Sequence, residues 1–208
     1  MQRVKGFPHQ SGKGVPVLQE TRKILDRLEM SPLLMKQHKG LPSIVSILTG
    51  EDLDHSWWSH PQSRLLFRVM SELADHPDVL VCKLLFRKDT FVHRRLFPAL
   101  LCAAQAEGVS PLGSAARELL KRIEASKNAL AGSGSAAKEL VLKVKVHALE
   151  LHTDSGKHEL KLESWRLWAK RAAVIPMPSS AAAVVALQQA AEALGAKSAA
   201  LPFQLEKS

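Results

Sequence analysis

The side chains best suited to binding chemistry in this chain are five cations close together in the sequence. Residues 83–95 contain five basic residues and a single acidic one, Asp89. The basic residues are Lys83, Arg87, Lys88, Arg94 and Arg95. The segment alternates like a β-hairpin, with strands over about 79–94 and a turn at about 87–89. Cations on a protruding hairpin attract phosphate and release counterions on contact, so this segment is a candidate for nucleic-acid binding.

The elements expected before the hairpin have the order of a known DNA-binding architecture. Hydrophobic periodicity and the positions of proline and glycine predict three helices, over about residues 18–30, 42–50 and 61–76. Three helices followed by a hairpin resemble, in element order, a winged helix-turn-helix module that covers about residues 18–95. The resemblance implies that the third helix lies in the major groove and that the hairpin lies on the phosphate backbone.

The third predicted helix carries two cations for that role, Arg64 and Arg68. It also carries Glu72 and Asp75, and it has few polar side chains at its N-terminal end, where they would read bases. The alternative is an ordinary α+β domain whose hairpin has charged residues on its solvent-facing side. Both interpretations predict the same elements.

Two adjacent tryptophans precede this helix, and His60 follows them closely. Trp57 and Trp58 are half of the four tryptophans in the chain. Adjacent indoles in a loop can stack on bases or on another planar ligand. Large aromatic residues more often anchor the next helix in the core. We therefore expect an anchor, and a ligand pocket at Trp57, Trp58 and His60 is the alternative.

A group of histidines and carboxylates in the second half could bind a metal ion. It comprises His147, Glu150, His152, Asp154 and His158. On a helix, the five-residue interval between His147 and His152 rotates the second imidazole by roughly 140° from the first, so the two do not converge. On a strand, His152 and His158 would face each other across a turn. No known ligand spacing is matched, and we expect no bound metal or cofactor.

Nothing local in the sequence indicates a catalytic nucleophile. Cys82 and Cys102 lie among apolar residues, which raise a thiol pKa and make it inert. The chain contains no tyrosine, no Gly-x-Ser-x-Gly elbow and no dinucleotide-binding fingerprint. Whether the protein is an enzyme is left open, and no catalytic residue is assigned.

Composition sets the broad class. The 208 residues include 29 Lys+Arg and 20 Asp+Glu, a formal charge of +9, and 46% are hydrophobic. That apolar content excludes an intrinsically disordered chain. No apolar run reaches the roughly 20 residues of a membrane span, the polar start lacks a signal-peptide core, and two cysteines are too few for a disulfide framework. We therefore expect a cytoplasmic protein with no membrane partner.

The expected fold is mainly α with one β-hairpin, an α+β chain whose winged-helix-like N-terminal half packs on a helical C-terminal half. We expect residues 1–17 to form a flexible basic arm and residues 18–108 to form the winged-helix-like domain. Residues 109–208 are expected to form the helical region, with a Gly/Ser linker near 131–135. An Ala-rich helix over 180–194 should pack against the body. Residues 139–152 fit either a helix or a strand, and in the second case residues 158–162 would form the partner strand. Strong helix formers before residue 139 favour the helix.

The excess charge does not itself select a function, because both halves of the chain are net positive, at +4 and +5. The local concentrations in the arm and the hairpin favour nucleic-acid binding, and DNA in particular. One alternative is a small-molecule-binding protein or metal-dependent enzyme that uses the tryptophan loop or the 147–158 segment. Another is a helical protein-interaction module. A homo-oligomer is compatible with each.

Overall fold

The computed structural model describes residues 14–106, 111–152 and 158–203. These residues form a mixed α/β structure with eight α-helices and two three-stranded antiparallel sheets. The sequence predicted one hairpin, and the structure contains a second one. Of the predicted arm, residues 1–13 lie outside the described residues, and the remainder is the first turn of helix α1 (Gly14–Met30).

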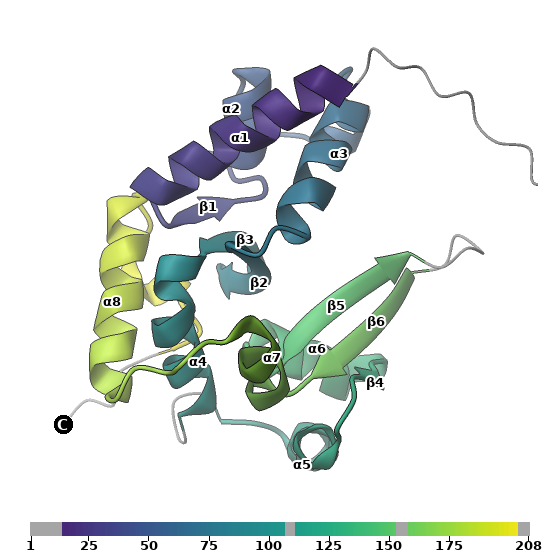
Figure 1. Cartoon of the computed structure of the whole chain (residues 1–208), viewed down its shortest axis with the longest axis vertical. Coiled ribbons are helices and arrows are strands. Elements are labelled where there is room, and N and C mark those ends of the chain that lie inside the picture. Colours follow the sequence, from purple (N-terminus) through teal and green to yellow (C-terminus); the bar gives the residue numbers. More distant parts are fainter. Residues whose placement is uncertain (1–13, 107–110, 153–157, 204–208) are drawn as a thin grey trace, which may run out of the picture.

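The first half of the chain folds as three helices around a small sheet (Figure 1). Helix α1 is followed by strand β1 (Leu33–Met35), helix α2 (Ile44–Thr49), helix α3 (Ser63–Ala74) and strands β2 (Val79–Leu85) and β3 (Lys88–His93). The strand order is β1-β3-β2, so β1 pairs with the hairpin. Strand β1 is not among the elements predicted from the sequence, and its three residues are buried.

The hairpin turn lies one residue before its predicted position. Phe86 and Arg87 form it, and both have positive φ, at 53° and 58°. Two such residues make the tight turn whose twist matches that of the flanking strands. The Phe86 amide donates to the carbonyl oxygen of Ala200 at 2.8 Å, which fixes the hairpin tip to the C-terminal segment.

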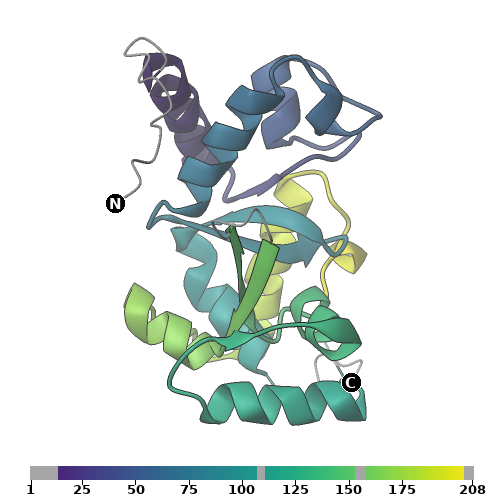
Figure 2. The ribbon, with the colours of Figure 1, turned by 90° about the vertical axis from the view of Figure 1, so that its right-hand side faces the viewer.

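One large core unites the first half of the chain with its C-terminal helices. Helix α4 (Phe97–Gln105) packs along helix α8 (Ser180–Ala193), and helix α7 (Trp165–Ala172) also contacts α4 (Figure 2). The Ala-rich helix is buried along one face, as predicted. Because Leu28, Leu100 and Leu187 belong to the same buried cluster, this core extends across the predicted boundary at residue 108.

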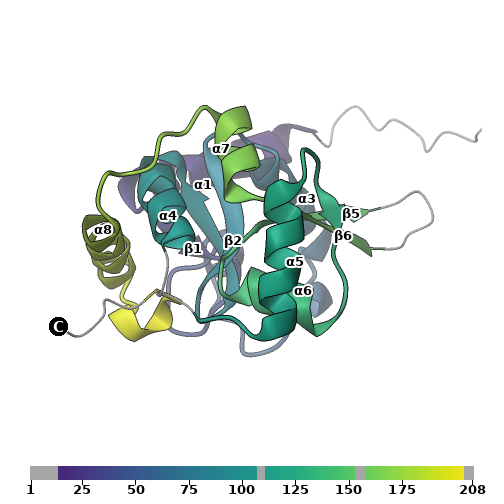
Figure 3. The same cartoon turned by 90° about the horizontal axis from the view of Figure 1, so that it is seen from below.

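A second, smaller core lies between helices and a sheet in the middle of the chain. Helix α5 (Ser114–Ala125), strand β4 (Leu130–Ala131), helix α6 (Gly134–Leu142) and strands β5 (His147–His152) and β6 (His158–Glu163) enclose it (Figure 3). The Lys145 ammonium donates to the carbonyl oxygens of Ala104 and Ala106 at the C-terminal end of α4, which connects the two cores.

The helix favoured for residues 139–152 is wrong beyond Leu142. The chain reverses at Val144, with φ of 54°, and continues as β5, which pairs with β6 in register from His147↔Glu163 to His152↔His158. The predicted linker holds β4 and the start of α6. Gly132 is required there by close packing, because a Cβ atom at that position would meet the Leu162 side chain at 2.8 Å.

Candidate nucleic-acid interface

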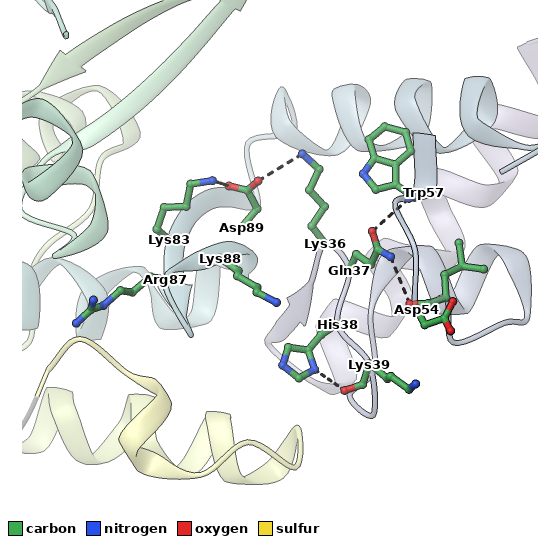
Figure 4. Close-up of a pocket in the computed structure, with 11 residues that line it drawn as sticks. Lys36, Gln37, His38, Lys39, Asp54, Trp57, Lys83, Arg87, Lys88 and Asp89 are labelled. Carbon is green, nitrogen blue, oxygen red and sulfur yellow. Dashed lines mark hydrogen bonds and ion pairs between the residues drawn. The ribbon is translucent and has the colours of Figure 1, made fainter. Parts of the chain in front are cut away.

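The turn end of the β2–β3 hairpin forms one wall of a basic cleft (Figure 4). The cleft has a volume of about 480 Å³ and is lined by residues 36–39, 53, 54, 57, 83 and 87–89. Three of the seven predicted nucleic-acid contacts, Lys83, Arg87 and Lys88, lie in it. The opposite side comes from the loop after β1, which supplies Lys36 and Lys39.

Hydrogen bonds hold the two loop segments of the cleft together. The Gln37 side-chain amide donates to the carbonyl oxygens of Leu53 and His55, at 3.4 and 2.6 Å, and its oxygen accepts from the Trp57 amide. The Lys36 amide donates to the Asp89 carbonyl oxygen at 2.9 Å, which joins this loop to the hairpin. The cleft is thus formed by segments that are far apart in the sequence.

Five cations and two carboxylates set the charge of the cleft. The Asp89 carboxylate accepts from Lys83 at 2.6 Å and from Lys36 at 3.4 Å. Partial burial raises the pKa of this carboxyl, but the two ammonium groups outweigh that effect and hold the pKa below its usual range. Among the described residues, no carboxylate lies within ion-pair distance of Lys39, Arg87 or Lys88, and all three side chains are exposed. Their charges are therefore available to an anion.

Arg94 and Arg95 lie at the opposite end of the hairpin from the cleft. Lys88 pairs with Leu85 at the turn end of the ladder, whereas His93 pairs with Val79 at the other end. Arg94 forms an ion pair with Asp78 at 2.8 Å, and the Arg95 guanidinium donates to the carbonyl oxygen of Glu29 in the last turn of α1. These two arginines are therefore far from Lys83, Arg87 and Lys88 in the structure, although they are close to them in sequence.

Helix α3 presents the two remaining predicted cations on its exposed face. Arg64, Phe67 and Arg68 are spaced by three and four residues, so they share a face, and all are exposed. The other side of the helix is buried through Leu66 and Val69. This division follows directly from the apolar periodicity of the sequence.

The tryptophan pair divides between the core and the surface. Trp57 is buried and lines the cleft, with the Lys36 ammonium 5.8 Å from its ring centroid. Trp58 is 61% exposed, stacks on Trp57 with centroids 3.9 Å apart, and lies 5.8 Å from the Phe67 ring. His60 does not line the cleft; its Nδ1 atom accepts from the Gln62 amide at the start of α3. The anchor interpretation fits Trp57 and not Trp58.

The histidine segment contributes to an ion-pair network around a buried carboxylate, which the sequence did not reveal. The His147 Nδ1–H donates to Glu163 at 2.7 Å, and Arg171 binds both oxygens of the same carboxylate at 2.6 and 2.7 Å. Burial raises the pKa of Glu163, but the bonds from His147 and Arg171 outweigh it and lower the pKa to about 2. A strand pattern over 147–152 was the only available signal, since it places position 147 opposite position 163.

The structure gives no support to a metal centre or a reactive thiol in the parts of the chain that it describes. No group of three or more His, Cys, Asp or Glu side chains in those parts could hold a metal ion. Asp154 and the side chains of Glu150, His152 and His158 lie outside the described residues. Burial raises the pKa of the Cys82 thiol to about 12 and also raises that of Cys102, and a raised pKa lowers the fraction of nucleophilic thiolate.

Two further findings bear on the class of protein. Within residues 14–106, 111–152 and 158–203, every helix is too short or too polar to cross a bilayer. Comparisons with protein-family models, with curated proteins and with solved structures gave no match. Function must therefore be inferred from the geometry and charge of the site.

Proposed function

We propose that the protein binds nucleic acid, and DNA in particular, through the basic cleft and the adjoining exposed face of α3. The observation that carries this proposal is the cleft itself, where no carboxylate of the described residues lies within ion-pair distance of Lys39, Arg87 or Lys88. Cations of this kind bind phosphates and release the counterions condensed on them, which is the main source of sequence-independent affinity for DNA.

The topology of the first half is consistent with a winged-helix-like role. Three helices precede the hairpin in the expected order, and the short strand β1 extends the hairpin into a sheet. In this reading, α3 would present Arg64 and Arg68 to a groove, and the turn at Phe86 and Arg87 would face the phosphate backbone. The tip is short and held by Ala200, so we assign it backbone contacts rather than base recognition.

The test compares two double variants that remove the same charge from different places. Arg87→Ala/Lys88→Ala removes two cations from the cleft. Lys121→Ala/Arg122→Ala removes two exposed cations from α5, which borders the second core. Fluorescence anisotropy with a labelled duplex measures the affinity of each variant.

We expect the cleft variant to bind at least about tenfold more weakly than wild type at low salt, and the α5 variant to bind within about twofold of it. Equal losses in the two variants would show that only overall charge matters and would refute the assignment of the site. No binding by the wild-type protein at low salt would refute the function.

A second candidate function uses the same cleft. Its volume of about 480 Å³ is in the range of small-ligand pockets, and Trp57 supplies an aromatic wall of the kind such pockets have. The cleft could therefore hold a small phosphorylated molecule instead of a nucleic-acid backbone. Calorimetric titration with inorganic phosphate and with a nucleoside monophosphate separates the two. Tight binding of the mononucleotide, with no gain for an oligonucleotide, favours the small-ligand function.

A further inference from the structure

Trp58 is the one tryptophan of this chain whose ring is largely open to solvent. It is 61% exposed, whereas Trp57, Trp165 and Trp168 are each at most 5% exposed. Trp58 is adjacent in sequence to a buried tryptophan, so the fold buries one indole of the pair and leaves the other exposed to solvent. An indole costs considerable free energy to leave in water, so its display suggests a ligand.

The displayed ring is held in place from one side. The buried Trp57 ring stacks on it at 3.9 Å and 26°, so one face of Trp58 is covered by a fixed neighbour. Because the residue is still 61% exposed, the stack covers only part of the indole, and the other face is largely open, with the tilted Phe67 ring 5.8 Å away. This arrangement is a preorganised stacking platform.

Cations lie next to this platform. Arg64 and Arg68 flank Phe67 on the exposed face of α3. The Lys36 ammonium lies at most about 10 Å from the Trp58 ring centroid, because the 5.8 Å and 3.9 Å separations share the Trp57 ring. A strand with its phosphates in the cleft can therefore bring a base to Trp58. Two aromatic rings flanked by arginines make a small patch compared with the roughly 800 Å² that each partner buries in a stable protein complex, which favours nucleic acid over protein.

We propose that Trp58 stacks on an unpaired base of a nucleic-acid strand whose phosphates occupy the basic cleft. In a paired duplex both faces of each internal base are covered by its neighbours, so the ring can reach only a base that is unpaired or at a strand end. The protein then prefers single-stranded DNA, or a duplex with an unpaired base, to a fully paired duplex. This inference rests on the proposed nucleic-acid function.

The test uses the intrinsic fluorescence of the full chain. Since the other three indoles are buried, quenching by an added oligonucleotide reports mainly on Trp58. The probes are a single strand of about 12 nucleotides and a duplex of the same length. The variants are Trp58→Ala and Trp58→Phe, with Ile175→Ala as the control because Ile175 is also apolar and exposed, at 81%.

We expect the single strand to bind wild type more tightly than the duplex and to quench its fluorescence. Trp58→Ala should weaken single-strand binding by about 5- to 150-fold, the equivalent of one base stack at 1–3 kcal/mol, and leave duplex binding unchanged. Trp58→Phe should retain part of the affinity, and Ile175→Ala all of it.

Two failures are distinguishable. Binding of both probes with no quenching and no effect of Trp58→Ala overturns the stacking role and leaves the proposed function intact. Absence of binding to either probe by wild type overturns the proposed function and this inference with it.

Discussion

Replacing Asp89 by asparagine should strengthen nucleic-acid binding. The Asp89 carboxylate lies in the cleft, repels phosphate, and holds Lys83 and Lys36 at 2.6 and 3.4 Å. At a separation of about 8 Å and an effective dielectric constant of about 40–80, one unit charge changes the interaction with a phosphate by about 0.5–1 kcal/mol. We therefore expect Asp89→Asn to raise the affinity roughly two- to fivefold at low salt.

The matched control for this substitution is Asp78→Asn. It adds the same unit of charge to the protein, but Asp78 pairs with Arg94 at the far end of the hairpin. The six residues of β3 span about 20 Å, roughly two Debye lengths at 0.1 M salt, so this charge should have almost no effect on an anion in the cleft. Anisotropy titrations of both variants against one labelled oligonucleotide measure the difference.

Equal changes in the two variants, or weaker binding by Asp89→Asn in a sample whose thermal unfolding shows it to be folded, would refute the reasoning. The unfolding measurement is necessary because the carboxylate also organises the cleft. Asp89 has a lowered pKa, so its ionised form stabilises the folded state, and some loss of stability is expected in the variant.

Three further predictions concern stability and are measured by urea unfolding. The pKa of Glu163 is lowered to about 2 from an ordinary value of 4.5. The ionised carboxylate therefore contributes about 3 kcal/mol to the free energy of unfolding above pH 4.5, and this contribution is lost as the pH falls from 4.5 towards 2. Glu163→Gln should remove this part of the pH dependence, and an unchanged dependence of stability on pH would contradict the prediction. Ala173→Gly should stabilise the protein by about 0.5–1 kcal/mol, because Ala173 ends α7 with φ of 52°; a destabilised variant would disprove this. Trp57→Ala should lower the free energy of unfolding by about 3–5 kcal/mol, and Trp58→Ala should lower it by less than about 1 kcal/mol. Similar losses in the two variants would show that the exposed Trp58 ring also stabilises the fold.

The helices and the first hairpin follow from local sequence patterns. Helix α3 buries one face with a regular apolar spacing, and β2 is bounded by Pro77 and a tight turn, so both were predictable from a short window of residues. Strand β1 was not, because three buried residues show no alternation, and they become a strand only by pairing with β3.

The second sheet depended on contacts between distant residues. Residues 147–152 satisfy both a helical and an alternating pattern, and the helix formers before them favoured the wrong one. The strand is selected by pairing with β6 and by the close approach of Gly132 to Leu162. Neither contact is visible in a local window. The buried carboxylate of Glu163 was missed for the same reason, since its partners lie 16 and 8 residues away.

The candidate site was only partly predictable. The basic hairpin was evident from residue types, but a run of cations says nothing about which end of a strand each one occupies, and Arg94 lies at the far end from Arg87. Lys36 and Lys39 enter the cleft because β1 pairs with β3 and brings the following loop to the hairpin turn. A short, acid-free basic segment at 36–39 was the only trace of this in the sequence.

The salt dependence of wild-type binding to single-stranded and duplex DNA tests the central claim most directly. If Lys39, Arg87 and Lys88 of the cleft and the two arginines of α3 each neutralise one phosphate, the logarithm of the duplex binding constant should fall with the logarithm of salt concentration with a slope of about −4.5. A slope between about −2.7 and −4.5, which corresponds to three to five phosphates, is the predicted result. A slope near zero, or no measurable binding at low salt, would contradict the proposal that this cleft binds nucleic acid.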